Sequence, residues 1–437
     1  MGCFLFFTGL LLAGIAAAGL RPGLLDAPGP ALGIWCAATA GYAGAVFMVL
    51  RRGHGAPGLW AVLAAALVLR LAALGFPAHF TTDYYRYIWD ARVGAAGENP
   101  FRHAPSDPET APLRHTPDND VFHRINHKHT PTIYGPAAQA LFRVARAVFG
   151  ENPARWRILF LLADCAAVLL IAALLGAAGL PRAWCAVYAL HPLVLVDFTA
   201  NMHLDAVLLA LLAASLLCAV RRRAAAAGLL LAGAALIKYF PILFLPLIAG
   251  LAVRHQETAR GRLVRWGLCG AAFAAAVLLA YIPFMAPGVD LFAGLKTFTR
   301  EFTVTQWSPY WLAQRVAGRA AADALMLAAP AGAALWCLAP GTARARLQRA
   351  FWVAAALALF APVQRPWYFA WALPFCCVRA WWSWLLLGCL ALLTYSLFIA
   401  FDYIYIVKPV QYLVFYAALA AELAFAVRAR RREAARA

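Results

Sequence analysis

The sequence predicts an all-helical, polytopic integral membrane protein. Of its 437 residues 64% are hydrophobic and only 13% are charged, a composition that a water-soluble chain of this length does not tolerate. Apolar stretches of about 20 residues, the length that spans a bilayer as a helix, recur from the N-terminus almost to the C-terminus. Because a spanning segment must satisfy its own backbone hydrogen bonds, we expect these stretches to be helices.

The charge distribution argues for a membrane and against nucleic acid. A formal net charge of +19 would indicate nucleic-acid binding in a soluble protein. Here the basic residues stand in short clusters between apolar stretches, where they act as topology signals. Arginine far outnumbers lysine and alanine is abundant, which is typical of a GC-rich bacterial genome. We therefore expect a multi-pass protein of the bacterial cytoplasmic (inner) membrane, with no nucleic-acid partner.

The first crossings are expected at residues 3–20, 31–50 and 57–76. The first of them lacks the basic flank of a cleaved signal peptide, so we expect it to stay in the protein. With a cytoplasmic N-terminus, Arg51 and Arg52 fall on the cytoplasmic side and the loop after residue 76 falls on the other side, as the positive-inside rule requires.

The remaining crossings follow residue 155. They are expected at 156–177, 183–198, 203–220, 225–240, 241–253, 264–284, 320–339, 350–363, 366–379, 382–401 and 410–427. The total is about fourteen transmembrane helices, with a range of 11–14, since some stretches are short for a full crossing. The basic clusters and the C-terminus then all lie in the cytoplasm.

These crossings divide the chain into segments. Residues 1–56 hold two N-terminal helices, 57–76 form the first core-like helix, and 77–155 form a long non-cytoplasmic loop with short interfacial helices. Residues 156–427 form the remaining bundle, and 428–437 form a basic cytoplasmic tail. Within the loop, residues 134–150 are apolar but carry two arginines, so we expect an amphipathic helix that lies in the interface. If it spanned the membrane, the topology after it would invert.

Asp83 stands at the start of the long loop, beside several aromatic residues. A carboxylate in such a place can serve as general base for a hydroxyl nucleophile. An equally good explanation is that Asp83 caps a helix over residues 84–93, with Thr82 as a competing cap. The two roles are compatible.

Three short polar segments interrupt the apolar stretches at 201–205, 238–241 and 364–368. Basic flanks return each hairpin to the cytoplasm, so these tips point toward the side that holds the long loop. Charges at membrane depth are costly and tend to mark function. Lys238 and Arg365, with Lys296 or Arg300, would make a cationic receptor for a phosphate. Taken singly, each is better explained as an interface anchor that reaches lipid phosphate; the convergence of several cations favours the receptor.

Histidines 123, 127 and 129 have a spacing that permits metal binding, but the surrounding prolines and the weak helical pattern favour solvated or hydroxyl-binding side chains. We therefore predict no metal site.

The order of these features resembles the C-type (GT-C) polyprenol-phosphate-dependent glycosyltransferases, in particular their bacterial mannosyltransferase-like branch. The similar patches are residues 83–90, 97–100, 132–136, 201–205, 236–241 and 366–374. As a set they are fairly specific, and the resemblance covers residues 67 to 374. It implies a GT-C-like core, preceded here by an N-terminal addition, because two helices stand before the usual first helix.

The resemblance implies a chemistry and a set of residues. The donor would be a polyprenyl-phosphate sugar of the undecaprenyl or decaprenyl type, with mannose as the favoured sugar, and the acceptor a glycan, glycolipid or protein. The catalytic residue falls on Asp83, with inversion at the sugar, and the donor phosphate would lie at Lys238, Arg365, Arg300 and Lys296. Sugar and acceptor contacts are expected from Tyr84, Arg86, Tyr87, Trp89, Asp90, Asn99, His127, His129, Tyr134, Asn201, His203, Asp205, Tyr239, Trp367 and Tyr368.

Relatives with a second acid after the catalytic one suggest a bound divalent metal, but here Tyr84 follows Asp83. We expect no obligatory cofactor, although a divalent metal is compatible with the chemistry. The alternative functions are a lipid-linked sugar transporter or flippase, which predicts internal repeats and charges in mid-membrane, and a polysaccharide polymerase or ligase, which places its largest outer loop late in the chain.

Overall fold

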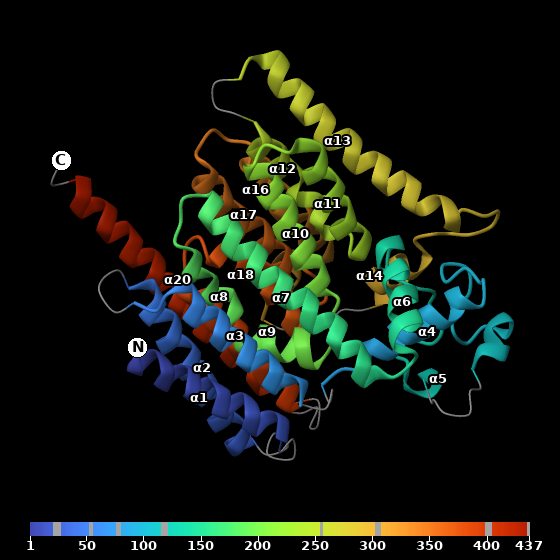
Figure 1. The fold of residues 1–437 in the computed structure, drawn as a ribbon, viewed down its shortest axis with the longest axis horizontal. Coiled ribbons are helices and arrows are strands. Elements are labelled where there is room, and N and C mark those ends of the chain that lie inside the picture. Colours follow the sequence, from blue (N-terminus) through green and yellow to red (C-terminus); the bar gives the residue numbers. More distant parts are fainter. Residues whose placement is uncertain are drawn as a thin grey trace.

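The computed structural model describes residues 1–20, 28–51, 56–75, 80–114, 121–253, 257–301, 307–397 and 404–434. In that part of the chain every regular element is a helix, which confirms the predicted fold class (Figure 1). Arg52 and Arg254, two of the basic flanks, lie outside the described residues, as does the end of the expected crossing 382–401.

The N-terminal part is a helical hairpin followed by a third helix. These are α1 (Gly2–Leu20), α2 (Pro28–Leu50) and α3 (Leu59–Leu74). α1 and α2 approach closely at small residues: a Cβ on Gly41 would lie 2.5 Å from the backbone nitrogen of Leu11. Small residues that allow such contact are how helices pack in lipid.

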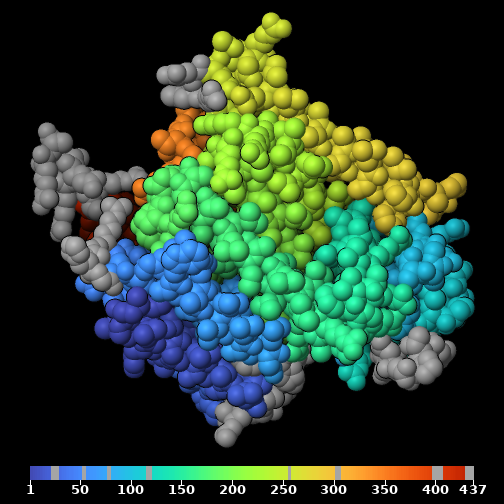
Figure 2. All heavy atoms as spheres, in the orientation of Figure 1, coloured from blue at the N-terminus to red at the C-terminus, as the bar shows by residue number. Residues whose placement is uncertain are grey.

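The long loop folds into short helices at one end of the molecule. They are α4 (Asp83–Ala95), η2 (Pro108–Leu113), α5 (Val121–Arg124) and α6 (Pro136–Phe149). α6 is amphipathic and ends at Phe149, before the long helix α7 (Pro153–Ala177), so it is a separate element, while its place in the interface stays a prediction. In the space-filling view this loop, in cyan, lies against the gold segment that follows α13 (Figure 2). The Asn99 amide donates a hydrogen bond to the Phe284 carbonyl in that segment.

The central bundle contains a helix that the sequence predicted as one crossing at 183–198. It is broken into η3 with α8 (Arg182–Ala189) and α9 with the π-helix η4 (Pro192–Ala200), bent by 63°. The break follows from Pro192, which has no N–H to donate, and from His191, whose ring accepts the Leu193 N–H at 3.2 Å.

The other helices of the bundle follow in chain order. They are α10 (Asp205–Val220), α11 (Ala224–Ile237), η5 (Phe240–Phe244), α12 (Leu245–Ala252), α13 (Ala259–Tyr281), η6 (Ile282–Phe284), α14 (Ala293–Glu301), α15 (Pro309–Ala317), α16 (Arg319–Trp336), α17 (Ala343–Leu359), η7 (Pro366–Ala372), α18 (Leu373–Cys376), α19 (Trp382–Ala391), η8 (Leu392–Leu397) and α20 (Ile404–Ala434).

Five helices of the described chain are long and apolar enough to cross a bilayer, and the bent pair makes a sixth if counted as one span. They are Gly2–Leu20, Gly29–Leu50, Pro153–Ala177, Ala259–Phe284 and Val407–Arg428. Several other expected crossings contain shorter apolar helices, such as α10 and α11. The chain is therefore a helical membrane protein, while the number of about fourteen crossings stays a prediction.

A buried ion pair joins two of these helices. The Arg70 guanidinium of α3 lies 2.9 Å from the Asp164 carboxylate of α7, and both side chains are buried. Tyr188 also donates to Asp164, at 2.9 Å. A charge at this depth needs such partners.

Candidate active site

A cavity of about 700 Å³ lies where the long loop meets the tips of the central hairpins. Ten of the residues predicted for the site line it: Asp83, Arg86, Tyr87, His127, Tyr134, Lys238, Tyr239, Arg365, Trp367 and Tyr368. They come from α4, the segment before α6, the end of α11 and the start of η7. Segments far apart in sequence thus meet at one cavity.

Asp83 is the first residue of α4, and its side chain is 29% exposed. The N-cap residue of α4 is Thr82, whose side chain makes no capping hydrogen bond. Asp83 is therefore not the N-cap residue. The helix dipole favours a negative charge in the first turn. Asp83 therefore presents an accessible carboxylate to the cavity.

His203 lies directly behind this carboxylate. Its Nδ1 is 4.0 Å from Oδ2 of Asp83, and its buried ring stacks on the cavity residue Trp367 with ring centroids 3.7 Å apart. The preceding residue, Met202, has a φ of 59°, and the π-helix η4 ends just before it. Such strained backbone persists where the surroundings enforce it and often marks a functional site. His203 does not itself line the cavity, but it contacts Asp83 and Trp367, which do.

Lys238 is held by a carboxylate. Its Nζ lies 2.6 Å from Oδ2 of Asp205, whose other oxygen accepts a 2.6 Å hydrogen bond from the Trp371 indole. Asp205 is fully buried, while the Lys238 side chain is 21% exposed. The cation predicted for a phosphate is therefore one half of an ion pair that is neutral before any ligand binds.

Arg365 differs from Lys238 in this respect. It is half-buried in the cavity wall, and in the described part of the chain no carboxylate lies within ion-pair distance of its guanidinium. The charge of Arg365 affects His127, which also lines the cavity. Partial burial lowers the pKa of His127, the negative charge of Asp83 raises it, and the positive charge of Arg365 lowers it further. Arg365 is thus a cation that can receive an anion.

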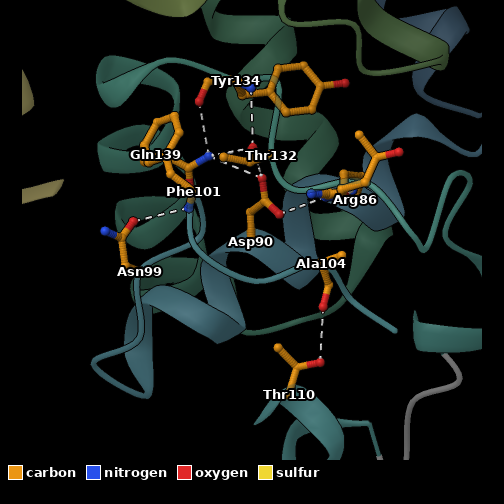
Figure 3. Close-up of polar contacts among 10 residues, drawn as sticks. Arg86, Asp90, Asn99, Phe101, Ala104, Thr110, Thr132, Tyr134 and Gln139 are labelled. Atoms are coloured by element: carbon orange, nitrogen blue, oxygen red, sulfur yellow. Dashed lines mark hydrogen bonds and ion pairs between the residues drawn. The ribbon is translucent and has the colours of Figure 1, made fainter. Parts of the chain in front are cut away.

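Figure 3 shows Asp90 and the side chains that bond to it, among them the cavity residue Arg86. One oxygen of the Asp90 carboxylate accepts a bond from Arg86 at 2.8 Å, and the other accepts bonds from Thr132 at 2.5 Å and Gln139 at 3.1 Å. Arg86 also donates to the Thr130 carbonyl at 3.0 Å. This buried network ties α4 to α6 and to the segment between them, so Asp90 lies beside the site as a support.

Two glycines allow the cavity walls to meet. A Cβ on Gly135 would lie 2.3 Å from the Leu236 carbonyl oxygen, and one on Gly294 would lie 2.5 Å from the carbonyl oxygens of Pro131 and Thr132. No other residue type fits these contacts. The segment before α6 is therefore clamped between the end of α11 and α14.

Other predicted residues lie outside the lining. Trp89 packs on Phe122, Asn99 bonds to backbone, and Asn201 donates to Asp197. Tyr84 is buried against Tyr85, and His129 is exposed outside the cavity. In α14, Lys296 pairs with Asp290 at 2.7 Å and Arg300 points to the exposed surface, whereas Leu295 and Phe298 face the cavity.

Sequence reasoning missed the apolar part of the lining. Phe80, Ile133, Phe240, Leu295 and Phe298 contribute to it. In an apolar chain such residues carry no distinguishing signal. The hydrogen bond from the Trp371 indole to Asp205 was also not predicted, because it joins positions 166 residues apart.

The described lining of the cavity offers few groups that could hold a metal. Asp83 is the acid in its lining, and Asp205 behind it already holds Lys238. Among the described residues, the group with metal-binding geometry is His103, Asp107 and Glu109, none of which lines the cavity. The histidines at 123, 127 and 129 do not form such a group.

A protein-family model described as Alpha-(1->6)-mannopyranosyltransferase, N-terminal domain, matches residues 31–254. No curated protein matches the chain. The matched half contains Asp83, His203, Asp205 and Lys238, while Arg365 and Trp367 come from the part that follows it.

Proposed function

The chain belongs to the alpha-(1->6)-mannopyranosyltransferase family, and from this premise we propose that the cavity transfers mannose from a polyprenyl-phosphate donor to a glycan hydroxyl. Membership confirms the resemblance to GT-C mannosyltransferases and makes the protein a membrane-bound glycosyltransferase. A sugar donor and a glycan acceptor follow from the family. The lipid carrier, the inversion of the sugar and the non-cytoplasmic side belong to the proposal.

The proposal rests on the presence of both Asp83 and Arg365 in the lining of one cavity. The first is an accessible carboxylate and the second a cation without a carboxylate partner among the described residues. Displacement of a phosphate by a hydroxyl needs a base for the incoming oxygen and a positive charge for the leaving one. The cavity supplies both.

The reaction follows from these positions. Asp83 accepts the proton of the acceptor hydroxyl as that oxygen bonds to C1 of the mannose. The bond from C1 to the phosphate oxygen breaks on the opposite face, and its electron pair stays with the polyprenyl phosphate, whose charge Arg365 balances. Attack from the opposite face inverts C1, so an alpha product requires a beta-linked donor. The family description supports the 6-hydroxyl of a mannose as the nucleophile.

His203 is a positioning residue in this scheme. Its ring fills the space between Asp83 and Trp367, so both side chains are held by one buried group. Trp367 and Tyr368 offer flat faces to the sugar, a common arrangement in which an aromatic ring packs against an apolar sugar face. The aromatic and aliphatic residues of the lining accommodate the start of the lipid tail.

No step requires a metal, because the Arg365 guanidinium balances the charge of the leaving phosphate. The proposed setting is the bacterial inner membrane with the cavity open to the periplasmic or extracellular side. The positive-inside pattern and the clustering of polar tips at one end support it.

The decisive experiment uses the purified full-length protein in nanodiscs. It is incubated with polyprenyl-phosphate mannose, glucose, galactose or arabinose and an alpha-mannoside acceptor, with and without a chelator, and the released polyprenyl phosphate is measured. We expect release with the mannose donor, unchanged by the chelator, and an alpha-(1->6) product. Mannosyl transfer from a nucleotide-activated mannose, with release of the nucleotide and none from the polyprenyl-phosphate donor, would refute the donor class, and loss of activity with the chelator would refute the metal-free mechanism.

A further inference from the structure

A second cavity, of about 380 Å³, lies far from the active site between α16, α17 and α20. We name it the arginine–tryptophan groove, after its lining residues Trp336, Arg349, Trp352, Arg379 and Trp381. From its chemistry and position we propose that it binds the head group of an anionic phospholipid. This inference does not depend on the proposed transferase mechanism.

The position of the groove indicates a membrane surface. α20 contributes Leu423, Ala426 and Val427, and the apolar span within that helix ends at Arg428. Arginine and tryptophan at the end of an apolar span mark the head-group level of a bilayer. Leu423, Val427 and Trp336 are each more than 40% exposed, so the groove opens on a side where the helices present apolar surface.

The groove also lies at the opposite end of α17 from the active-site cavity. Ala345, Gln348 and Arg349 line the groove from the first half of that helix, whereas Arg365 follows its end. α17 has 17 residues, which at a rise of about 1.5 Å per residue makes it about 25 Å long, close to the thickness of a hydrocarbon core. The two cavities therefore serve opposite leaflets.

The polar groups in the groove are mainly donors. The Arg379 guanidinium stacks on Trp381, with its central carbon 4.3 Å from the ring centroid. No described residue accepts a hydrogen bond from this guanidinium. The indole N–H groups of Trp336, Trp352 and Trp381 likewise have no acceptor among the described residues. Such a set suits a ligand that brings acceptor oxygens and negative charge.

Arg349 is fixed and contributes charge. It donates to the carbonyls of Ala339 at 2.6 Å and Pro340 at 2.9 Å, and its guanidinium lies over Trp336. The nearby acid Glu422 is occupied elsewhere: its carboxylate accepts bonds from the Trp382 and Ser383 N–H groups and from the Ser383 hydroxyl. No acid lines the described part of the groove, so its field is positive.

These features favour a lipid over a free anion. A phosphate ion would use the donors but leave the exposed faces of Trp336, Leu423 and Val427 without a partner. A phospholipid satisfies both, with its phosphate at Arg379 and its acyl chains along α20. Basic pockets between transmembrane helices on the cytoplasmic side are suited to such head groups.

The test is lipid retention measured by native mass spectrometry on the full-length protein. The protein is exposed to equal amounts of phosphatidylglycerol and phosphatidylcholine, and the bound lipids are counted for the wild type, Arg379→Gln and Arg344→Gln. Arg344 is the matched control, an exposed arginine in the first turn of α17 that does not line the groove. We expect preference for the anionic lipid in wild type and control, and about fivefold weaker preference in Arg379→Gln, the factor for one basic residue at a lipid surface.

Equal preference in Arg379→Gln and wild type would overturn the inference, and so would an equal loss in the control. Glycerol phosphate at millimolar concentration is the second arm: full displacement of the lipid would identify a site for soluble phosphate instead. If Arg379→Gln fails to fold, Trp352→Phe replaces it, since it keeps the ring and removes the N–H donor. An unchanged preference in that variant contradicts the proposal.

Discussion

At the scale of single residues, Asp83 and Lys238 are both charged groups in one cavity wall, yet their surroundings give them different tasks. Among the described residues, no lysine or arginine lies within ion-pair distance of Asp83, whose neighbour is the buried His203 ring at 4.0 Å, whereas Lys238 is bound to a buried carboxylate. The first is free to exchange a proton with a substrate. The second stabilises the wall in which it lies.

The role of Asp83 predicts the outcome of one substitution. Asp83→Asn removes the base but keeps the shape, so we expect mannosyl transfer to fall by about 10²–10⁴-fold with donor binding and melting temperature unchanged. The release of polyprenyl phosphate measures the rate. Asp290→Asn, at an exposed acid outside the cavity, is the control and should keep full activity. Wild-type activity in Asp83→Asn would contradict the assignment.

Lys238 and Arg365 should respond differently to removal of their charge. Lys238→Met leaves Asp205 buried without its partner, which should cost roughly 3–5 kcal/mol of stability, and adding Asp205→Asn should restore much of it. Arg365→Gln breaks no ion pair within the described part of the chain; it should leave stability unchanged and raise the KM for the donor about tenfold or more, as expected for a lost charge-assisted bond.

Thermal unfolding in detergent and donor titration separate these effects. A stable Lys238→Met variant with weak donor binding would show that Lys238 binds the phosphate directly, as the sequence first suggested. A destabilised Arg365→Gln variant would show that Arg365 is structural.

The sequence predicted which residues meet here but not how they pair. The polar tips were visible because charge stands out in an apolar chain, and their common side followed from the basic flanks. Pairing depends on distance in space: Asp205 and Lys238 are 33 positions apart, and local sequence gives no reason for that acid to hold that cation. The hydrogen-bond partners of Asp90 were not predictable for the same reason, because its three donors come from different elements.

At the scale of elements, one acid joins the helices of the long loop to the bundle. Glu151 accepts bonds from Arg92 of α4 at 2.5 Å and from Arg146 of α6 at 2.9 Å, just before α7 begins. Burial acts to raise its pKa, but the hydrogen bonds from both arginines outweigh burial and hold the pKa below its usual value. The charged form of Glu151 therefore favours the folded state.

This junction predicts a pH-dependent stability. Because the pKa is lower in the folded state, the stabilisation is complete above the unfolded value of about 4.3 and is lost as the pH falls through the folded value. Glu151→Gln should lower stability by about 1–3 kcal/mol at pH 7, and the difference from wild type should shrink below pH 4. Melting temperatures from pH 7 to pH 3 measure it. Glu98→Gln, at an exposed acid, should have no effect at any pH.

Helices were predicted well where they are long and less well where they break. The expected crossing 156–177 lies within α7, because an unbroken apolar stretch leaves no alternative in lipid. The expected crossing 183–198 is bent at Pro192, a residue visible in the sequence. Proline there marks a break, but the angle and the π-helix after it depend on packing. These irregular turns are what deliver His203 and Asp205 to the site.

At the scale of the whole molecule, the cavity and the arginine–tryptophan groove should face opposite sides of the membrane. Cysteine labelling tests this. Lys296→Cys, near the cavity, and Arg344→Cys, near the groove, are each made in a background with the exposed Cys3 and Cys36 changed to alanine. A membrane-impermeant maleimide should label the first in intact cells and the second only after permeabilisation. Labelling of both from the same side would contradict the topology.

The size of the active-site cavity limits what the enzyme can sense of its donor. About 700 Å³ falls within the range of about 300–1,000 Å³ that holds a drug-sized molecule, far less than a whole polyprenyl chain. With the proposed polyprenyl-phosphate donor, the sugar, the phosphate and the first isoprene units would fill it, and the rest of the chain would stay in the lipid. The number of isoprene units then affects partitioning into the membrane but not the chemical step, so a short-chain analogue should react with an unchanged kcat and a raised KM.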